Sequence, residues 1–487
     1  MPVFVRMRDQ LFADGRAYPA YCEEHKAASR SRLRATNLKD LKARADRSWQ
    51  LVAPAIEKLQ ADGLSDVQRY WIVNGFACHA DGEAVAALTR LPAVAYVHRQ
   101  VPAGALKKAP PRSPGWLTKR EADEQRALQL LQKRGVEVPF VTDGVQVPWN
   151  LKAVRAEQAW QLGATGKGVK VAIIDTGLLC FPPLVHALWQ NPREVLDGKD
   201  NDGNGYVDDV FGWDFGGATR FAVGDGKKSH GTMCAGILAG RPWGKSNTVT
   251  GVAPRAQLMV LRGSGKLSAY EYAAQMGADV LSMSYMMMNP DLGSFRGVFR
   301  TAHEHLAACG VVSVGGAGNF AKTAKPGHQI ALPKDIPCVI AASGVGRDMA
   351  VPSFSSRGPC MWDDVPFFGD YPASAPLQKP DVCACAAGFP VWHWVQAPGR
   401  SLKVQWQNAD GFGLVVGPRG NSFSGPHAGG VAALMLSVQP ELPAWRVQEL
   451  MIESCRDLGK QGWDVTHGAG MLRADEAVRL ARAAKIH

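Results

Sequence analysis

Three short motifs along the chain contain residue types that together could activate a hydroxyl group for nucleophilic attack. They are Asp175 in Asp-Thr-Gly, His230 in His-Gly-Thr, and Ser422 in Gly-Asn-Ser-Phe-Ser-Gly-Pro-His. A serine hydroxyl is a weak nucleophile at neutral pH. It needs a base within hydrogen-bonding distance and a carboxylate that orients the base. The chain therefore contains, in the order Asp, His, Ser, the three groups of a catalytic triad.

Each of these residues could instead have a structural role. Asp175 follows the apolar run 169–174, and carboxylates are common in the turns that end buried strands. A lone histidine could cap a helix or lie in a core. Ser422 precedes a helix that we expect to begin near Pro426, where the helix dipole would favour a developing negative charge. The three residues together favour catalysis.

Apolar runs that alternate with helical patterns must position these residues. From Pro148 onward, aliphatic runs bounded by Gly, Asp or Pro are separated by helical stretches at 269–276 and 299–308. This alternation predicts an α/β fold with a mostly parallel sheet flanked by helices. Ligands of such sheets bind beyond the carboxyl ends of the strands, where we expect Asp175. The predicted strands are 169–174, 258–261, 280–284, 311–314 and 338–342.

The residues before this region divide into a small unit and a linker. Residues 1–100 have a β-α-β-β-α-β pattern, which predicts a small ferredoxin-like α+β domain. Residues 101–147 contain a Pro-rich breaker and a charged stretch, 116–134, that could form a surface helix. We therefore expect domains at 1–100 and 148–487, joined by this linker.

The composition indicates a globular protein. Of the 487 residues, 46% are hydrophobic and 20% are charged, and no run of 18 apolar residues could span a membrane. The net charge is +11, and residues 1–150 carry about +7 of it. A nucleic-acid protein more often has its basic groove on the main domain. We therefore expect neither nucleic acid nor a membrane as a partner.

The cysteines and the N-terminal residues bear on the cell compartment. Several of the ten cysteines lie in segments that resemble core, so we expect buried thiols. Cys383 and Cys385 could be a metal pair or a disulfide partner, but no second pair at ligand spacing accompanies them. The first residues lack the basic-then-apolar order of a signal peptide. We expect a cytoplasmic protein, or a secreted one if a leader precedes this sequence.

The motifs together resemble those of the subtilisin-like serine proteases, the subtilases of peptidase family S8. The resemblance covers about 148–487, and residues 1–100 resemble the propeptide of these enzymes. It implies that Asp175 orients His230, that His230 acts as general base and then general acid, and that Ser422 is the nucleophile. It also implies that Asn319, in Gly-Gly-Ala-Gly-Asn, donates to the oxyanion together with the backbone N–H of Ser422.

The serine motif departs from the family pattern. Subtilases usually have Gly-Thr-Ser-Met-Ala, whereas this chain has Gly-Asn-Ser-Phe-Ser at 420–424. Ser424 is therefore a second candidate nucleophile, but its spacing to Pro426 favours Ser422. We expect His427 to be a packing residue without a catalytic role.

The resemblance also implies two backbone segments that would hold an extended substrate as an added strand. The second segment departs from the family, because large side chains stand where Leu-Gly-Gly is usual. These side chains would reshape the pocket for the residue before the scissile bond, although they could equally be core residues. The predicted substrate-binding residues are Arg262, Gly263, Ser264, Ser284, Tyr285 and Met286.

The segment 200–209 has oxygen-bearing side chains at alternate positions. It resembles the first nine positions of an EF-hand, but Phe211 stands where that loop needs a bidentate Glu. Subtilases often have such acidic loops, so a structural calcium site and a series of Asx turns are both open. The predicted calcium ligands are Asp200, Asp202, Asn204 and Asp208.

These features lead us to expect a serine endopeptidase that is made as a self-inhibited precursor and needs no cofactor for its chemistry. Its own propeptide would inhibit it, and the family's tail length places self-cleavage near Leu106-Lys107. Two alternatives remain open. One is a processing enzyme dedicated to one protein or precursor peptide, and the other is a non-catalytic relative that binds peptides.

Overall fold

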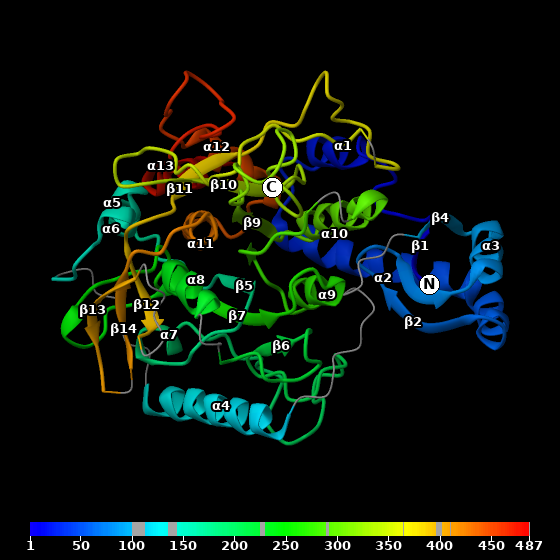
Figure 1. The fold of residues 1–487 in the computed structure, drawn as a ribbon, viewed down its shortest axis with the longest axis horizontal. Helices are drawn as coiled ribbons and strands as arrows, with labels where there is room; N and C mark the ends of the chain where they lie inside the picture. Colours follow the sequence, from blue (N-terminus) through cyan, green and yellow to red (C-terminus); the bar gives the residue numbers. More distant parts are fainter. Residues whose placement is uncertain are drawn as a thin grey trace.

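A seven-stranded sheet forms the centre of the computed structural model (Figure 1). The structure describes residues 1–99, 113–134, 144–224, 229–288, 292–363, 365–395, 402–409 and 411–486. The strand order is β11-β10-β9-β8-β5-β7-β6, and every neighbouring pair is parallel. The strands are β5 Lys170–Asp175, β6 Gly212–Asp214, β7 Gln257–Arg262, β8 Val280–Met283, β9 Val312–Gly316, β10 Val339–Val345 and β11 Val382–Cys385.

Helices cover both faces of this sheet, as the alternating pattern predicted (Figure 1). On one face, α11 contacts strands β8 to β11 and packs against α8 and α13. On the other face, α10 contacts β9, α9 and the N-terminal helix α2, and every residue of α10 is buried. The helices are α8 His230–Ala239, α9 Leu267–Gln275, α10 Arg296–Ala308, α11 Ser424–Val438, α12 Ala444–Glu453 and α13 Ala474–Ala483.

The N-terminal residues form a small α+β unit beside α9 and α10 (Figure 1). Its antiparallel sheet has the order β2-β3-β1-β4, which is that of a ferredoxin-like fold. Apolar side chains between this sheet and its helices form a separate small core. The elements are β1 Pro2–Met7, α2 Arg30–Ala61, β2 Leu64–Tyr70, β3 Gly75–Ala80, α3 Gly82–Arg90 and β4 Val94–His98.

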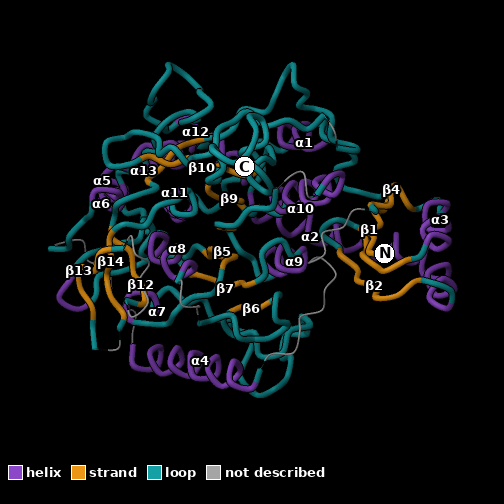
Figure 2. Tube along the Cα trace, viewed as in Figure 1, coloured by secondary structure: helices purple, strands orange, loops and turns teal. Residues whose placement is uncertain are grey.

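Several elements were absent from the sequence prediction. Helix α1, Ala17–Glu24, is inserted between β1 and α2, and a three-stranded antiparallel sheet in the order β12-β14-β13 lies beside α8 (Figure 2). By contrast, the charged stretch 116–134, for which a surface helix was predicted, does form a helix, α4 Pro114–Arg134. The remaining elements are β12 Pro390–Trp394, β13 Lys403–Gln407, β14 Phe412–Val416, α5 Trp149–Ala153, α6 Ala156–Gln161, α7 Pro182–Val185 and the 3₁₀ turns Gly244–Ser246 and Gly293–Phe295.

The cysteines are thiols, as expected. All ten are free, and eight of them are buried, including Cys383 and Cys385 on β11. Within the described residues, no helix has the length and apolarity needed to cross a membrane.

Candidate active site

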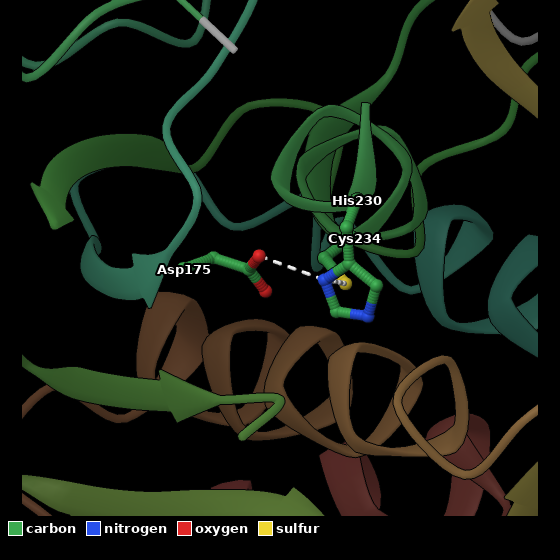
Figure 3. Close-up of side chains that lie close together, drawn as sticks. All are labelled: Asp175, His230 and Cys234. Carbon is green, nitrogen blue, oxygen red and sulfur yellow. Dashed lines mark hydrogen bonds and ion pairs between the residues drawn. The ribbon is translucent and has the colours of Figure 1, made fainter. Parts of the chain in front are cut away.

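Asp175 and His230 lie together at the carboxyl edge of the sheet. Asp175 is the last residue of β5, and its Oδ1 is 2.7 Å from Nδ1 of His230, the first residue of α8 (Figure 3). Helix α8 can approach because Gly231 lacks a side chain: a Cβ there would lie 2.1 Å from the carbonyl oxygen of Gly177. The Asp175 side chain is only 5% exposed. The hydrogen bond is therefore shielded from water, which strengthens it.

Cys234 lies one helical turn after His230 and contacts the same ring (Figure 3). Its sulfur is 3.9 Å from Nδ1 of His230 and 3.5 Å from the carbonyl oxygen of Ser422. A thiolate at Cys234 and the hydrogen bond to Asp175 would both raise the pKa of His230. Burial raises the pKa of the Cys234 thiol, which keeps it neutral. At neutral pH the carboxylate of Asp175 is therefore the group that raises the pKa of His230.

Ser422 lies two residues before α11, and its carbonyl oxygen contacts Cys234 on the helix that begins with His230. Its hydroxyl donates to the carbonyl of Ser284 at 3.3 Å, and the hydroxyl of Ser284 donates back to the carbonyl of Ser422 at 2.7 Å. The ring of Phe423 lies 5.8 Å from that of His230. Attack on a substrate would require the Ser422 hydroxyl to rotate toward His230. Catalytic hydrogen bonds are often long or misaligned before substrate binds.

Asn319 follows β9 and faces the serine motif. Its side-chain Oδ1 accepts a hydrogen bond from the backbone N–H of Asn421 at 2.8 Å. This bond fixes the orientation of the amide and makes Nδ2 the end that can donate to a ligand. Asn319 and Ser422 both line one small pocket of about 110 Å³. The other residues that line it are Ser284, Tyr285, Met286, Gly316, Gly318 and Phe320.

Asn421 stands where the family motif usually has threonine. It forms hydrogen bonds to two other segments of the chain around this pocket. Its buried Nδ2 donates to the carbonyl of Gly318 at 2.7 Å and to the hydroxyl of Ser355 at 2.9 Å. Its carbonyl approaches Gly316 so closely that a Cβ there would lie 1.7 Å away. Asn421 thus ties the serine motif to the loop that contains Asn319. The sequence motif alone did not indicate this role.

The two other polar residues of the serine motif, Ser424 and His427, are buried and form hydrogen bonds to backbone carbonyl groups. The hydroxyl oxygen of Ser424 lies 2.7 and 2.8 Å from the carbonyl oxygens of Ala342 and Asn421, either of which can accept its one proton, and Ser424 is fully buried. Nδ1 of His427 lies 2.7 Å from the carbonyl oxygen of Phe423. Burial lowers the pKa of His427 to about 4. Of the two serines, Ser422 is the one that lines the pocket.

The two predicted substrate-binding segments are placed differently. Ser284, Tyr285 and Met286 line the pocket, whereas Arg262, Gly263 and Ser264 are not among the residues that line it. The guanidinium of Arg262 donates instead to the carbonyl oxygens of Thr176 and Gly224 and, at 3.2 Å, to Asp214. Arg262 therefore holds the loop that follows Asp175.

The acidic loop brings three carboxylates together. Oxygens of Glu194, Asp200 and Asp202 lie within 4.8 Å of one another, so three of the hard oxygen ligands that Ca²⁺ prefers converge there. Glu194 is an addition to the predicted set. Asp208 accepts two backbone N–H groups at 3.0 Å, and Nδ2 of Asn204 donates to another aspartate of the loop at 2.9 Å. The loop fits both a cation and a series of Asx turns, so calcium stays a prediction.

Comparison with known proteins places the chain in a family. It is 24% identical over 469 residues to Bacillopeptidase F from Bacillus subtilis, which is 91% of this chain but 28% of that longer protein. Subtilisin DY from Bacillus licheniformis is 26% identical over 344 residues, 68% of this chain and 99% of that protein. Fervidolysin from Fervidobacterium pennivorans is 26% identical over 350 residues, 68% of this chain and 43% of that protein. The model of the Subtilase family matches residues 166–470, more than half of the chain. The chain therefore belongs to the subtilase family of serine peptidases.

Proposed function

We propose that this protein is a serine endopeptidase that hydrolyses peptide bonds in protein or peptide substrates through an acyl-enzyme. The observation that carries the proposal is the 2.7 Å hydrogen bond between Asp175 and His230, at the sheet edge beside the pocket that Ser422 and Asn319 line. Membership of the subtilase family supports the same activity.

The geometry supports a defined role for each group. Neutral His230 takes the proton of the Ser422 hydroxyl through Nε2, because Nδ1 is bonded to Asp175. The serine oxygen attacks the scissile carbonyl, and the oxyanion accepts hydrogen bonds from Nδ2 of Asn319 and the backbone N–H of Ser422. The imidazolium then gives its proton to the leaving amine. Water repeats the sequence on the acyl-enzyme and releases the second product.

A fluorophosphonate probe tests this proposal because it labels only an activated serine hydroxyl. We expect labelling and casein hydrolysis with the wild-type chain and neither with Ser422→Ala. The matched control is Ser424→Ala, which removes a hydroxyl two residues away and should still be labelled. Labelling that persists in Ser422→Ala and disappears in Ser424→Ala would assign the nucleophile to Ser424.

We further propose that residues 1–100 act as an intramolecular inhibitor that the enzyme cleaves itself. Contacts with the larger domain support this proposal: the half-buried Glu271 on α9 accepts the backbone N–H groups of Trp71 and Ile72 at 2.5 and 3.1 Å. The expected cleavage site, Leu106-Lys107, lies outside the described residues. Intact mass spectrometry should show a cut in the wild-type chain and none in Ser422→Ala. Equal cutting of both chains would point to a host protease.

A narrower function, the processing of one partner protein, is the second candidate. The bulky pocket residues Tyr285 and Met286 favour it, since they restrict the space beside Ser422. Digestion of a broad peptide library decides between the two: many cleaved sequences indicate a general protease, and one or none indicates a dedicated partner. If the fluorophosphonate also fails to label the chain, the non-catalytic peptide-binding alternative is favoured.

Calcium and cellular location are separate proposals. If Ca²⁺ binds Glu194, Asp200 and Asp202, EGTA should lower the melting temperature of the Ser422→Ala chain, and Asp200→Asn should remove that response. An unchanged melting temperature in EGTA would favour the Asx-turn interpretation.

Fractionation of cells that express the full-length gene would test the predicted cytoplasmic location.

A further inference from the structure

A buried lysine lies behind the pocket and has no role in the chemistry described above. Lys334 is 1% exposed, and its Nζ has no hydrogen-bond partner among the residues that the structure describes. A buried charged group without a partner is unfavourable. Burial accordingly lowers the pKa of Lys334 to about 7, while the nearby carboxylates of Asp335 and Asp175 partly oppose this shift. An anion that enters this region would find an unused donor.

The side chain of Lys334 reaches the pocket wall from the side of the sheet that α10 covers. It passes over Gly315, where a Cβ would lie 2.4 Å from Cε of Lys334. Its Nζ is 4.9 Å from the centre of the Tyr285 ring. Tyr285 and Gly316, the residue after Gly315, both line the pocket next to Ser422. The ammonium group therefore lies against the aromatic ring of a residue that lines the pocket.

The carboxylates near Lys334 are occupied by other partners. Oδ2 of Asp335 lies 3.1 Å from the guanidinium of Arg296. Asp175 is bonded to His230. Neither provides a hydrogen bond to Nζ of Lys334, so among the described residues the direct contact of this group is the face of the Tyr285 ring, which cannot neutralise a charge as a carboxylate does. Contact with an anion in the pocket would therefore require the Lys334 ammonium or the Tyr285 ring to shift, and the four-carbon stem of lysine has the rotatable bonds for such a shift.

We propose that Lys334 is a specificity-determining residue that selects glutamate immediately before the scissile bond. This inference rests on the proposed endopeptidase function, because that residue must enter the pocket beside Ser422. A glutamate carboxylate would give Lys334 the hydrogen bond and counter-charge that it lacks. Glutamine has the same length without the charge, and it would bind less well. The predicted self-cleavage after Leu106 is intramolecular, so proximity can replace side-chain affinity in that step.

The test is a set of fluorogenic peptides that differ only in the residue before the scissile bond: Glu, Gln or Leu. A charged hydrogen bond should make kcat/KM for Glu about 10- to 100-fold higher than for Gln. In Lys334→Met this ratio should fall to about 1, while kcat/KM for Leu stays within about threefold of wild type. Lys334→Arg should keep part of the Glu preference. The control Lys322→Met removes the same charge from an exposed position twelve residues earlier in the chain and should leave the ratio unchanged.

Labelling of Ser422 by the fluorophosphonate separates failure of this inference from failure of the proposed function. If the wild-type enzyme is labelled but does not prefer Glu over Gln, the inference is wrong and the endopeptidase function stands. An equal loss for all three peptides in Lys334→Met would also overturn it. Absence of labelling would overturn both proposals. The ratio of kcat/KM for the Glu and Gln peptides is measured on the wild-type enzyme. It therefore tests the inferred preference for glutamate even if Lys334→Met does not fold.

Discussion

A buried ion-pair cluster joins the N-terminal unit to the central sheet, and its removal should loosen that unit. Asp279 lies just before β8, and its Oδ1 is 2.5 Å from Nη1 of Arg30 and 3.3 Å from Nη1 of Arg34, both on α2. The Asp279 side chain is 7% exposed, and the arginines are 11% and 20% exposed. Its Oδ2 also accepts the backbone N–H of Lys170 at 2.8 Å.

The change Asp279→Asn removes the charge and keeps the size of the side chain. Breaking a buried pair on one side costs about 3–5 kcal/mol. Arg30 and Arg34 retain backbone carbonyl partners, so we take the lower value. A loss of about 3 kcal/mol in the local opening free energy corresponds to roughly 100-fold faster amide exchange in the first turns of α2.

Hydrogen exchange with mass spectrometry on the Ser422→Ala chain, which cannot cleave itself, measures this effect. The matched control is Asp46→Asn on the same helix, because its pair with Arg69 is exposed on both sides and should contribute less than about 1 kcal/mol. Unchanged exchange of peptides from 30–41 in Asp279→Asn, or an equal rise in both variants, would refute the reasoning.

Three further predictions concern the catalytic edge of the sheet. Asn319→Ala should lower kcat about 10²–10³-fold with little change in KM, measured in peptide assays, because one oxyanion donor is lost. In wild type, kcat/KM should rise with pH as the imidazolium of His230 loses its proton. Because Asp175 raises the pKa of His230, Asp175→Asn should move this rise to lower pH while reducing the rate about 10⁴-fold, and an unmoved pH profile would contradict the assigned pairing. Gly316→Ala should abolish fluorophosphonate labelling, since the new Cβ would lie 1.7 Å from the carbonyl oxygen of Asn421; a labelled, stable variant would show that the serine motif can shift.

Five of the seven strands of the sheet and the two residues at its edge were predictable from local patterns, whereas β6 and β11 were not among the predicted strands. The aliphatic runs correspond to the strands within a few residues, because a parallel sheet covered on both faces requires continuous apolar segments. Asp175 was expected at a strand end, and it is the last residue of β5. His230 stands in the His-Gly-Thr motif that the sequence analysis singled out, and Gly231 of this motif allows α8 to pack closely.

Other features depend on contacts between distant parts of the chain, which a local pattern does not encode. Lys334 stands between Pro333 and Asp335, a setting that suggests an exposed turn, and only the fold places it against Gly315 and Tyr285. The three-stranded sheet of β12 to β14 pairs short segments that the sequence analysis did not recognise as strands. Cys234 lies in a buried helix, and its contact with His230 follows from the helical turn rather than from its own motif.

Strand β9 ends in two successive glycines, and each of them makes room for a different part of the protein. Consecutive strand residues face opposite sides of a sheet, so the absent side chain of Gly316 makes room for the serine motif, and that of Gly315 makes room for the stem of Lys334. If Lys334 selects the substrate as proposed, changes on its side of the strand would alter which residue the enzyme accepts before the scissile bond without moving the groups that react. Selectivity could in this way be exchanged during evolution at positions 315 and 334, while the machinery on the other side of the strand stays fixed.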